Sequence, residues 1–239
     1  MIIRATLENF TRHHFSRDLA RSDEYSFGIE AAILLTDIAR NIVNIGKYRN
    51  DHKGWYFTTL DNLCRRHPYI SRSTVNRALM KLRKEEVLKT TDDFNKKKYD
   101  RTLWYTIPDP EILSLGSGDD DNISYVVNDA VRYGIEAAIL LSNVKHWTAY
   151  NIMDRPDYLY EYQSLSPAKL SDHSLVNLPM NPWTIRRALR VLAEDGALER
   201  KRSDIKGDGS YLYRVVETRH GLVKSPDSDY PTERTMHAE

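Results

Sequence analysis

The chain has 239 residues but only one cysteine, Cys64. A single cysteine excludes an internal disulfide and a zinc site built from several thiolates, and it is typical of a protein kept in a reducing cytoplasm. No apolar run approaches the roughly 20 residues that a helix needs to cross a bilayer. The first residues also lack the long hydrophobic stretch of a secretory signal. We therefore expect a cytoplasmic protein with no membrane partner.

Signals of catalysis and of bound cofactors are missing as well. No glycine-rich loop ends in Gly-Lys-Ser or Gly-Lys-Thr, the pattern that cradles nucleotide phosphates. The eight histidines include the adjacent pair His13 and His14, but none has the spacing of a metal-binding pair. Three consecutive acids, 119–121, could attract a cation, although a solvated linker explains them better. We therefore expect neither an enzyme nor a cofactor or metal site.

The chain does contain two copies of one sequence pattern. Three segments of the first half recur in the second half in the same order, which indicates duplication with loop insertions. They are FGIEAAILLT (27–36) with YGIEAAILLS (133–142), TVNRALMKL (74–82) with TIRRALRVL (184–192), and WYTI (104–107) with LYRV (212–215).

Periodicity and capping residues predict the same elements in each copy. For the first copy they are a helix from 29 to about 43, a strand at 54–58, a helix at 60–66, a helix capped by Ser71 or Ser73, and a hairpin with strands from 87 and over 103–107. For the second copy they are a helix from 135 to about 149, a strand at 159–162, helices starting at Pro167 and Pro182, and hairpin strands at 198–202 and 211–215.

Helix, strand, helix, turn, helix and hairpin follow one another in a winged helix. We therefore predict a mainly helical α+β fold with two tandem winged-helix domains. Proline, glycine and clustered acids predict a linker between them, and a polar end with little apolar content predicts a flexible tail. The predicted parts are a basic arm (1–22), winged-helix domain 1 (23–108), a linker (109–122), winged-helix domain 2 (123–218) and a C-terminal tail (219–239).

The distribution of charge is more informative than its total. The formal net charge is only +1, whereas many nucleic-acid-binding proteins are far more basic. The third helix of each copy is nevertheless free of acids, from Ser71 to Lys84 and from Asn181 to Leu192, and acids resume directly afterwards. In a helix-turn-helix, this helix lies in the major groove of DNA and its N-terminal residues meet the base edges. Local charge governs such a contact because salt screens charges beyond about 8–10 Å.

Positions in the pattern suggest individual roles. Asn76 has the groups to pair with adenine, and Arg77 with guanine. Residues expected in or beside the major groove are Arg72, Ser73, Thr74, Asn76, Arg77 and Lys81 of the first copy, with Trp183, Thr184, Arg186, Arg187 and Arg190 of the second. Residues expected at phosphates are Lys96, Lys97 and Lys98 of the first wing, with Arg200, Lys201, Arg202 and Lys206 of the second.

Each role has a structural alternative. A basic helix face is often merely solvated, and only its occurrence at two matching places favours DNA contact. Trp183 is as well explained by packing against the preceding turn as by contact with DNA. Trp104 and Tyr105 are expected in the core of a wing strand rather than stacked on bases.

The pattern resembles the winged-helix domains of phage and plasmid replication-initiation proteins. The resemblance rests on TIRRAL (184–189) with Leu-Glu-Arg downstream, on DRTLWY (100–105) as a return strand, and on the opening helix YGIEAAILL (133–141). It covers about residues 25–107 and 125–215. It implies recognition of a replication origin, often with recruitment of a helicase or its loader.

Three functions fit these observations. The first is origin recognition on double-stranded DNA for a phage or other mobile element, with replication proteins as further partners and association with the nucleoid when bound. The second is transcriptional repression with the same fold, usually as a homodimer that reads an inverted repeat. The third is a phage factor that binds and inhibits a host protein complex, because fold alone does not fix function.

Overall fold

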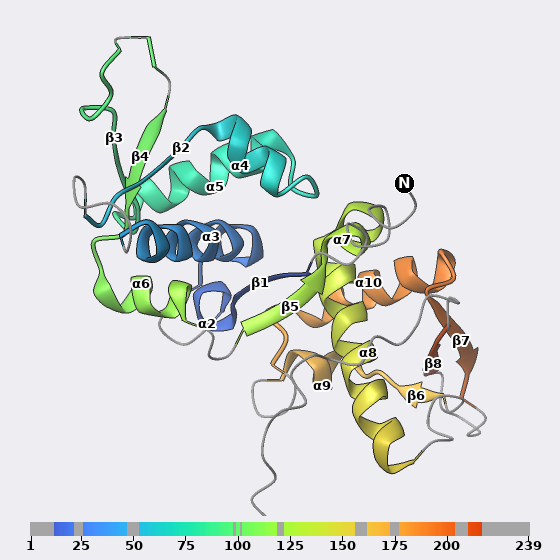
Figure 1. Cartoon of the computed structure of the whole chain (residues 1–239). Helices are drawn as coiled ribbons and strands as arrows, with labels where there is room; N and C mark the ends of the chain where they lie inside the picture. The colour runs from blue at the N-terminus through green and yellow to red at the C-terminus, as the bar shows by residue number, and fades with distance from the viewer. Residues whose placement is uncertain are drawn as a thin grey trace, which may run out of the picture.

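The computed structural model of the chain describes residues 12–21, 26–46, 53–97, 99–100, 102–118, 122–155, 162–172, 177–203 and 210–216. The fold is α+β, as the sequence predicts, with helices packed against short antiparallel sheets (Figure 1). Within those residues, no helix is both long enough and apolar enough to span a membrane.

The two halves of the chain have the same order of elements. The first half has β1 (Arg12–Ser16), α2 (Arg17–Ala20), α3 (Ile29–Gly46), β2 (Tyr56–Thr58), α4 (Leu60–Arg66), α5 (Arg72–Lys84), β3 (Lys89–Thr91) and β4 (Leu103–Thr106). The second half has β5 (Asn122–Val126), α7 (Val127–Tyr133), α8 (Ile135–Asp154), β6 (Gln163–Ser164), α9 (Pro167–Ser171), α10 (Pro182–Glu194), β7 (Leu198–Arg202) and β8 (Tyr211–Val215). Helix α6 (Pro110–Ser117) connects the halves.

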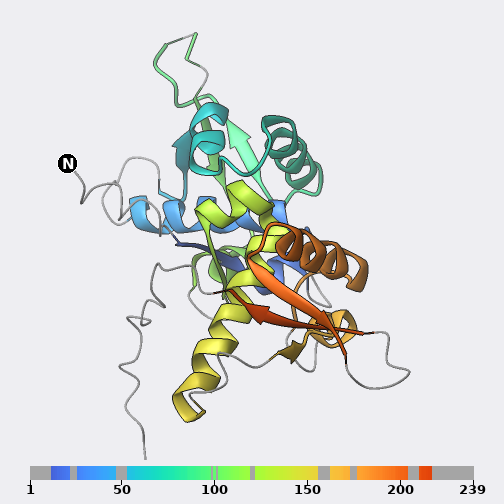
Figure 2. The same ribbon diagram turned by 90° about the vertical axis from the view of Figure 1, so that its right-hand side faces the viewer.

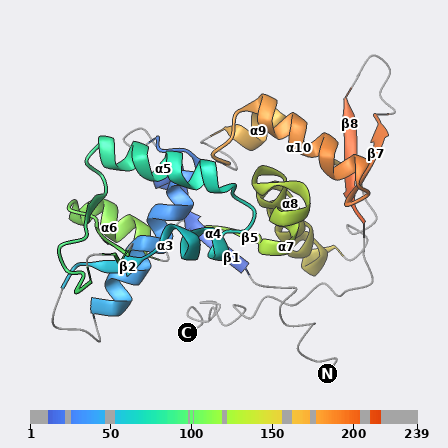
Figure 3. The ribbon, with the colours of Figure 1, turned by 90° about the horizontal axis from the view of Figure 1, so that it is seen from above.

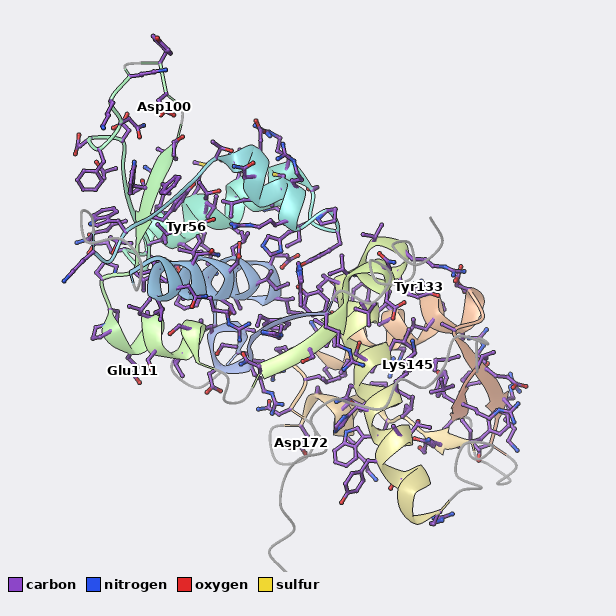
Figure 4. The ribbon with its side chains drawn as sticks, in the orientation of Figure 1. Tyr56, Asp100, Glu111, Tyr133, Lys145 and Asp172 are labelled. Carbon is purple, nitrogen blue, oxygen red and sulfur yellow. The ribbon has the colours of Figure 1, made fainter. Side chains whose placement is uncertain are left out.

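Each half ends in a three-stranded antiparallel sheet whose middle strand is the last in sequence. The strand order is β2-β4-β3 in the first half and β6-β8-β7 in the second. The two hairpins, β3–β4 and β7–β8, lie at opposite ends of the molecule (Figure 1). The loop of the first hairpin, which carries Asp100, projects away from the rest of the structure (Figure 4).

Helices α5 and α10 form for matching reasons. Ser71 caps α5 and Asn181 caps α10, and each side chain accepts a hydrogen bond from the backbone N–H three residues on. Each helix then places apolar residues at helical spacing on one face, which packs against the long helix of its own half, α3 or α8. The buried residues are Val75, Leu79 and Leu82 in α5 and Ile185, Ala188, Leu189 and Leu192 in α10.

A third sheet, formed by β1 and β5 alone, joins the two halves. The strands are antiparallel, with Arg12 opposite Val126 and Ser16 opposite Asn122. Phe15 and Tyr125 are fully buried beneath this ribbon, with ring centroids 6.1 Å apart. The segment 1–22, expected only as a basic arm, therefore contributes a strand and a short helix to the core.

The predicted linker, residues 109–122, is largely helical. Asp109 caps the first turn of α6, and Ile112 is buried. A Cβ atom at Gly116 would lie 2.7 Å from the Cβ of Ala39, so glycine is required for the close approach of α6 to α3. Linker composition was misleading here because the same glycine that suits a loop also suits a tight helix contact. The predicted tail, 219–239, lies outside the described residues.

A buried polar network lies between the turn before α5 and the β1–β5 ribbon. The Tyr69 hydroxyl is 3.2 Å from His13 Nδ1, 2.9 Å from His67 Nδ1 and 2.5 Å from the Tyr125 hydroxyl. His67 Nε2 lies 3.1 Å from the carboxylate of Asp37. One arrangement of protons satisfies these contacts: His67 Nε2–H donates to Asp37, Tyr69 donates to His67 Nδ1, and Tyr69 accepts from Tyr125 and His13.

Burial controls the protonation of this network. Loss of water around the two hydroxyls raises the pKa of Tyr69 and of Tyr125 well above the ordinary value of 10.0. Burial also lowers the pKa of His13 below its ordinary value of 6.5, and the nearby His67 lowers it further. The tyrosines therefore remain neutral, and His13 remains neutral at pH values where an exposed histidine begins to charge.

The turn after each of α5 and α10 provides a first prediction. Glu86 has φ 59° and Gly196, at the matching place, has φ 75°. A residue with a Cβ atom is destabilised by about 1–2 kcal/mol in this left-handed region. Glycine avoids that strain, although the greater freedom of its unfolded chain lowers the stability of the fold by roughly 0.5–1 kcal/mol. We expect Glu86→Gly to raise the free energy of unfolding by about 0.5–1 kcal/mol in urea titrations. The control, Glu85→Gly at φ −83°, should lower it; equal losses would contradict the account.

A second prediction follows from His13. Because its pKa is lowered in the folded state, the unfolded chain binds more protons as the pH falls through 6.5. The free energy of unfolding should therefore fall as the pH drops below that value. We expect His13→Gln, which keeps a donor for Tyr69, to reduce this loss, and the exposed His146→Gln serves as the matched control substitution. An equally steep loss in His13→Gln would show that His13 is not held neutral.

Candidate nucleic-acid interface

Helices α5 and α10 lie on the same side of the molecule, as two perpendicular views show (Figures 2 and 3). Each begins near the middle of the molecule and runs outward to its own hairpin (Figures 1 and 3). The ends that carry the sequence-predicted base contacts therefore face the centre of one surface. We call this surface, formed by α5 and α10, the two-helix face.

On α5, most of the predicted residues are exposed and held by local contacts. The Ser71 hydroxyl is 2.9 Å from the hydroxyls of both Ser73 and Thr74. Arg77 donates to the Thr74 hydroxyl at 3.4 Å, and the Asn76 amide lies 3.7 Å from the sulfur of Met80. The predicted residues of this helix are thus exposed, except for Thr74, which is half-buried.

Two cations of α5 are engaged elsewhere. The Arg72 guanidinium forms an ion pair with Asp61 of α4, although both side chains remain more than half exposed. Lys81 donates to the backbone carbonyl of Phe27 at 3.3 Å and lies 4.0 Å from Glu85. Lys81 is thus turned toward the N-terminal end of α3 and is a weaker candidate for the groove than its charge suggested.

On α10, Trp183 and Arg187 form one exposed unit. The Trp183 side chain is 64% exposed, so it does not pack into the preceding turn. Arg187 lies 5.4 Å from the centre of the Trp183 ring and 3.3 Å from the carboxylate of Glu136, at the start of α8. Arg190 faces Glu194 at 3.9 Å. The aromatic ring and the acid together fix the direction of Arg187.

Arg77 and Arg186 meet no acid among the residues that the structure describes, and the same is true of Arg83 and Lys84 at the end of α5. Arg77 and Arg186 are both exposed, and neither has a carboxylate within 4.0 Å in the described part of the chain.

Arg72 and Arg187 are partly balanced by Asp61 of α4 and Glu136 of α8, which lie 11 and 51 residues away in the sequence. Lys81 and Arg190 instead face acids one helical turn further along the chain. Asp61 and Glu136 belong to other helices, so the acid-free sequences of α5 and α10 do not reveal them. The sequence does place Glu136 in the repeated segment that starts each long helix.

The first hairpin holds its lysines on a structured loop. The Asn95 amide donates to the carbonyl of Thr102 at 2.7 Å and accepts from the Trp104 indole at 3.0 Å. Lys96 and Lys97 follow it directly and are exposed. Lys98, also predicted to contact phosphate, lies outside the described residues.

The aromatic residues of this hairpin have separate roles. Tyr105 is buried, whereas Trp104 is half-buried on the outer face of the sheet. There the Trp104 ring packs 5.0 Å from Phe57 and 5.3 Å from Phe94, measured between centroids. Trp104 is therefore occupied in a local aromatic cluster.

The second hairpin carries three of its four predicted cations in the described part. Arg200 lies 5.2 Å from the Tyr211 ring centre, and Lys201 lies 4.8 Å from that of Tyr162. Arg202 is exposed at the end of β7, and Lys206 falls outside the described residues. The rings of Tyr211 and Tyr162 hold two of the cations on the sheet surface.

A cavity beside β1 is a second candidate site. It has a volume of about 300 Å³ and is lined in part by Arg12, His14 and Arg40. Its carboxylate, Asp37, is already paired with Arg66 at 2.8 Å and with His67. In the described part of the chain, no cluster of three or more His, Cys, Asp or Glu side chains could hold a metal ion.

A comparison of the chain with protein-family models and with curated protein sequences finds no match.

Proposed function

We propose that the protein binds double-stranded DNA in a sequence-specific manner through two winged-helix units, with α5 and α10 as recognition helices. The supporting observation is that both halves contain a helix, a turn, a second helix and a hairpin in the same order, and that the two second helices lie on one side of the molecule. Binding by linked units also makes the second contact intramolecular, which raises the overall affinity.

Exposure and chemistry suggest which side chains read bases. Asn76 presents a donor and an acceptor that match adenine, and Arg77 and Arg186 present the paired donors that match guanine. Trp183 offers an exposed apolar ring to a thymine methyl group. We propose that the cations of the hairpins, Lys96 and Arg202 among them, neutralise phosphates, a contact that fixes the position of the protein without reading sequence.

The resemblance to phage and plasmid replication-initiation proteins favours origin recognition as the biological role. A repressor would use the same contacts, so footprints on the genome of the element itself distinguish the two by their location at an origin or at promoters. Binding to a host protein is the second candidate. It is favoured by the net charge of +1 and by Asp61 and Glu136, which reduce the positive charge of the two-helix face.

A third prediction tests the base contacts. Arg186→Ala should reduce affinity for a selected duplex by about 1–3 kcal/mol and relax the preference at one base pair, because the variant cannot form a bidentate hydrogen bond to guanine. Fluorescence anisotropy with the selected duplex and its single-base variants measures both effects. Arg155→Ala removes the same charge at the far end of α8 and should bind like the unaltered protein. If the two variants behave alike, α10 is not a recognition helix.

A fourth prediction tests the phosphate contacts. The double variant Lys96→Ala, Lys97→Ala should weaken binding to all duplexes equally and reduce the slope of log affinity against log salt by about 0.9 for each phosphate that is no longer neutralised. Titrations at several salt concentrations measure that slope. Binding that is absent even at low salt, or that does not depend on salt, would contradict DNA as the partner and favour a protein.

A further inference from the structure

The β1–β5 ribbon has the symmetry of a two-fold axis. Both strands have five residues, and each is followed directly by a short helix and then by a long helix. Position for position, His14 of β1 therefore corresponds to Ser124 of β5. In the antiparallel register these two residues lie opposite each other, and the pairs on either side are related by exchange of the strands. A local two-fold axis thus passes through the His14–Ser124 pair.

The turn before each recognition helix is hydrogen bonded to the other half of the molecule, across this axis. Tyr69, in the turn before α5, hydrogen bonds to Tyr125 of the second half. Met180, in the turn before α10, accepts a hydrogen bond through its carbonyl from Arg21 of the first half at 3.3 Å. Each recognition helix is therefore anchored near its N-terminal end to the opposite half. The two helices consequently keep a fixed separation and orientation.

We infer that one molecule reads two half-sites in inverted orientation, as an imperfect palindrome with a fixed spacing. This inference rests on the proposed function. In two-fold symmetric DNA-binding dimers, the symmetry of the protein is matched by the symmetry of the site, with half-site centres about 10–10.5 bp apart or a multiple of that distance. Here the axis lies within a single chain, so a homodimer is not needed to read an inverted repeat.

The two half-sites are alike but not identical. Thr74 corresponds to Thr184 and Arg77 to Arg187, which favours the same bases at mirrored positions. Asn76, by contrast, corresponds to Arg186. An adenine in one half-site should therefore be mirrored by a guanine in the other.

Selection of duplexes from a random library with the full chain tests the inference, combined with native mass spectrometry of the bound species. The expected result is two inverted elements at one fixed spacing, bound by one protein molecule. Two elements in direct orientation, a single undivided element, or one protein molecule on each half-site would each overturn the inference while leaving DNA binding intact. Failure to enrich any duplex would instead count against the proposed function itself.

Two matched variants locate the axis on the DNA. Selection repeated with Asn76→Ala should abolish the preference at one base pair, and selection with Arg186→Ala should abolish it at another. Both residues are exposed, so circular dichroism should confirm that each variant is folded. Under the inference, the two affected base positions are equidistant from the centre of the site on opposite strands. Affected positions on the same strand, one spacing apart, would show a direct repeat and overturn it.

Discussion

The antiparallel pairing of β1 with β5 is the contact on which the arrangement of the two halves depends. It joins residues that are about half the chain apart, and it packs Phe15 and Tyr125 into one core. Ordering such distant segments costs conformational entropy, which the burial of large apolar rings offsets. In the proton arrangement given above, Tyr125 donates to Tyr69 and Tyr69 donates to His67, so both buried hydroxyls of the joint are hydrogen bonded. The β1–β5 pairing thereby holds the two copies of the repeat together, with α5 and α10 on one side of the molecule.

The near-neutral net charge is compatible with a local DNA-binding surface. Surface ion pairs such as Arg72 with Asp61 contribute only about 0–1 kcal/mol, so a phosphate or a guanine can compete for the guanidinium. Until that exchange occurs, the acid limits the directions that the side chain samples. Arg187, held between Trp183 and Glu136, is restrained in the same way. Under the proposed function, such pairing weakens long-range attraction to any duplex, and the affinity then depends more on base contacts than on charge.

Elements that depend on residues close together in the sequence could be predicted from the sequence alone. The apolar stripes and caps of α5 and α10 were predictable because a helix with period 3.6 must bury one face. The β1 strand was not predictable, because its sequence, RHHFS, has no clear alternation and its partner lies on the other half of the chain. Helix α6 was missed for a related reason: its glycine is explained only by contact with Ala39.

The same limit applies to the candidate site. The exposed sides of α5 and α10 follow from their buried sides, so Asn76, Arg77 and Arg186 could be predicted as surface residues. Their acidic surroundings could not, because Asp61 and Glu136 come from other helices and approach only after folding. The sequence does not distinguish a packed from an exposed Trp183, since a tryptophan at the start of a helix fits both.

Chemical footprinting of guanine N7 on a selected duplex probes the proposed contacts of α5 and α10, because N7 lies in the major groove. We expect two protected segments on one face of the duplex, with centres about 10–10.5 bp or a multiple of that distance apart, both produced by a single protein molecule. A single protected segment, or no protection of N7 by a bound protein, would contradict the proposal.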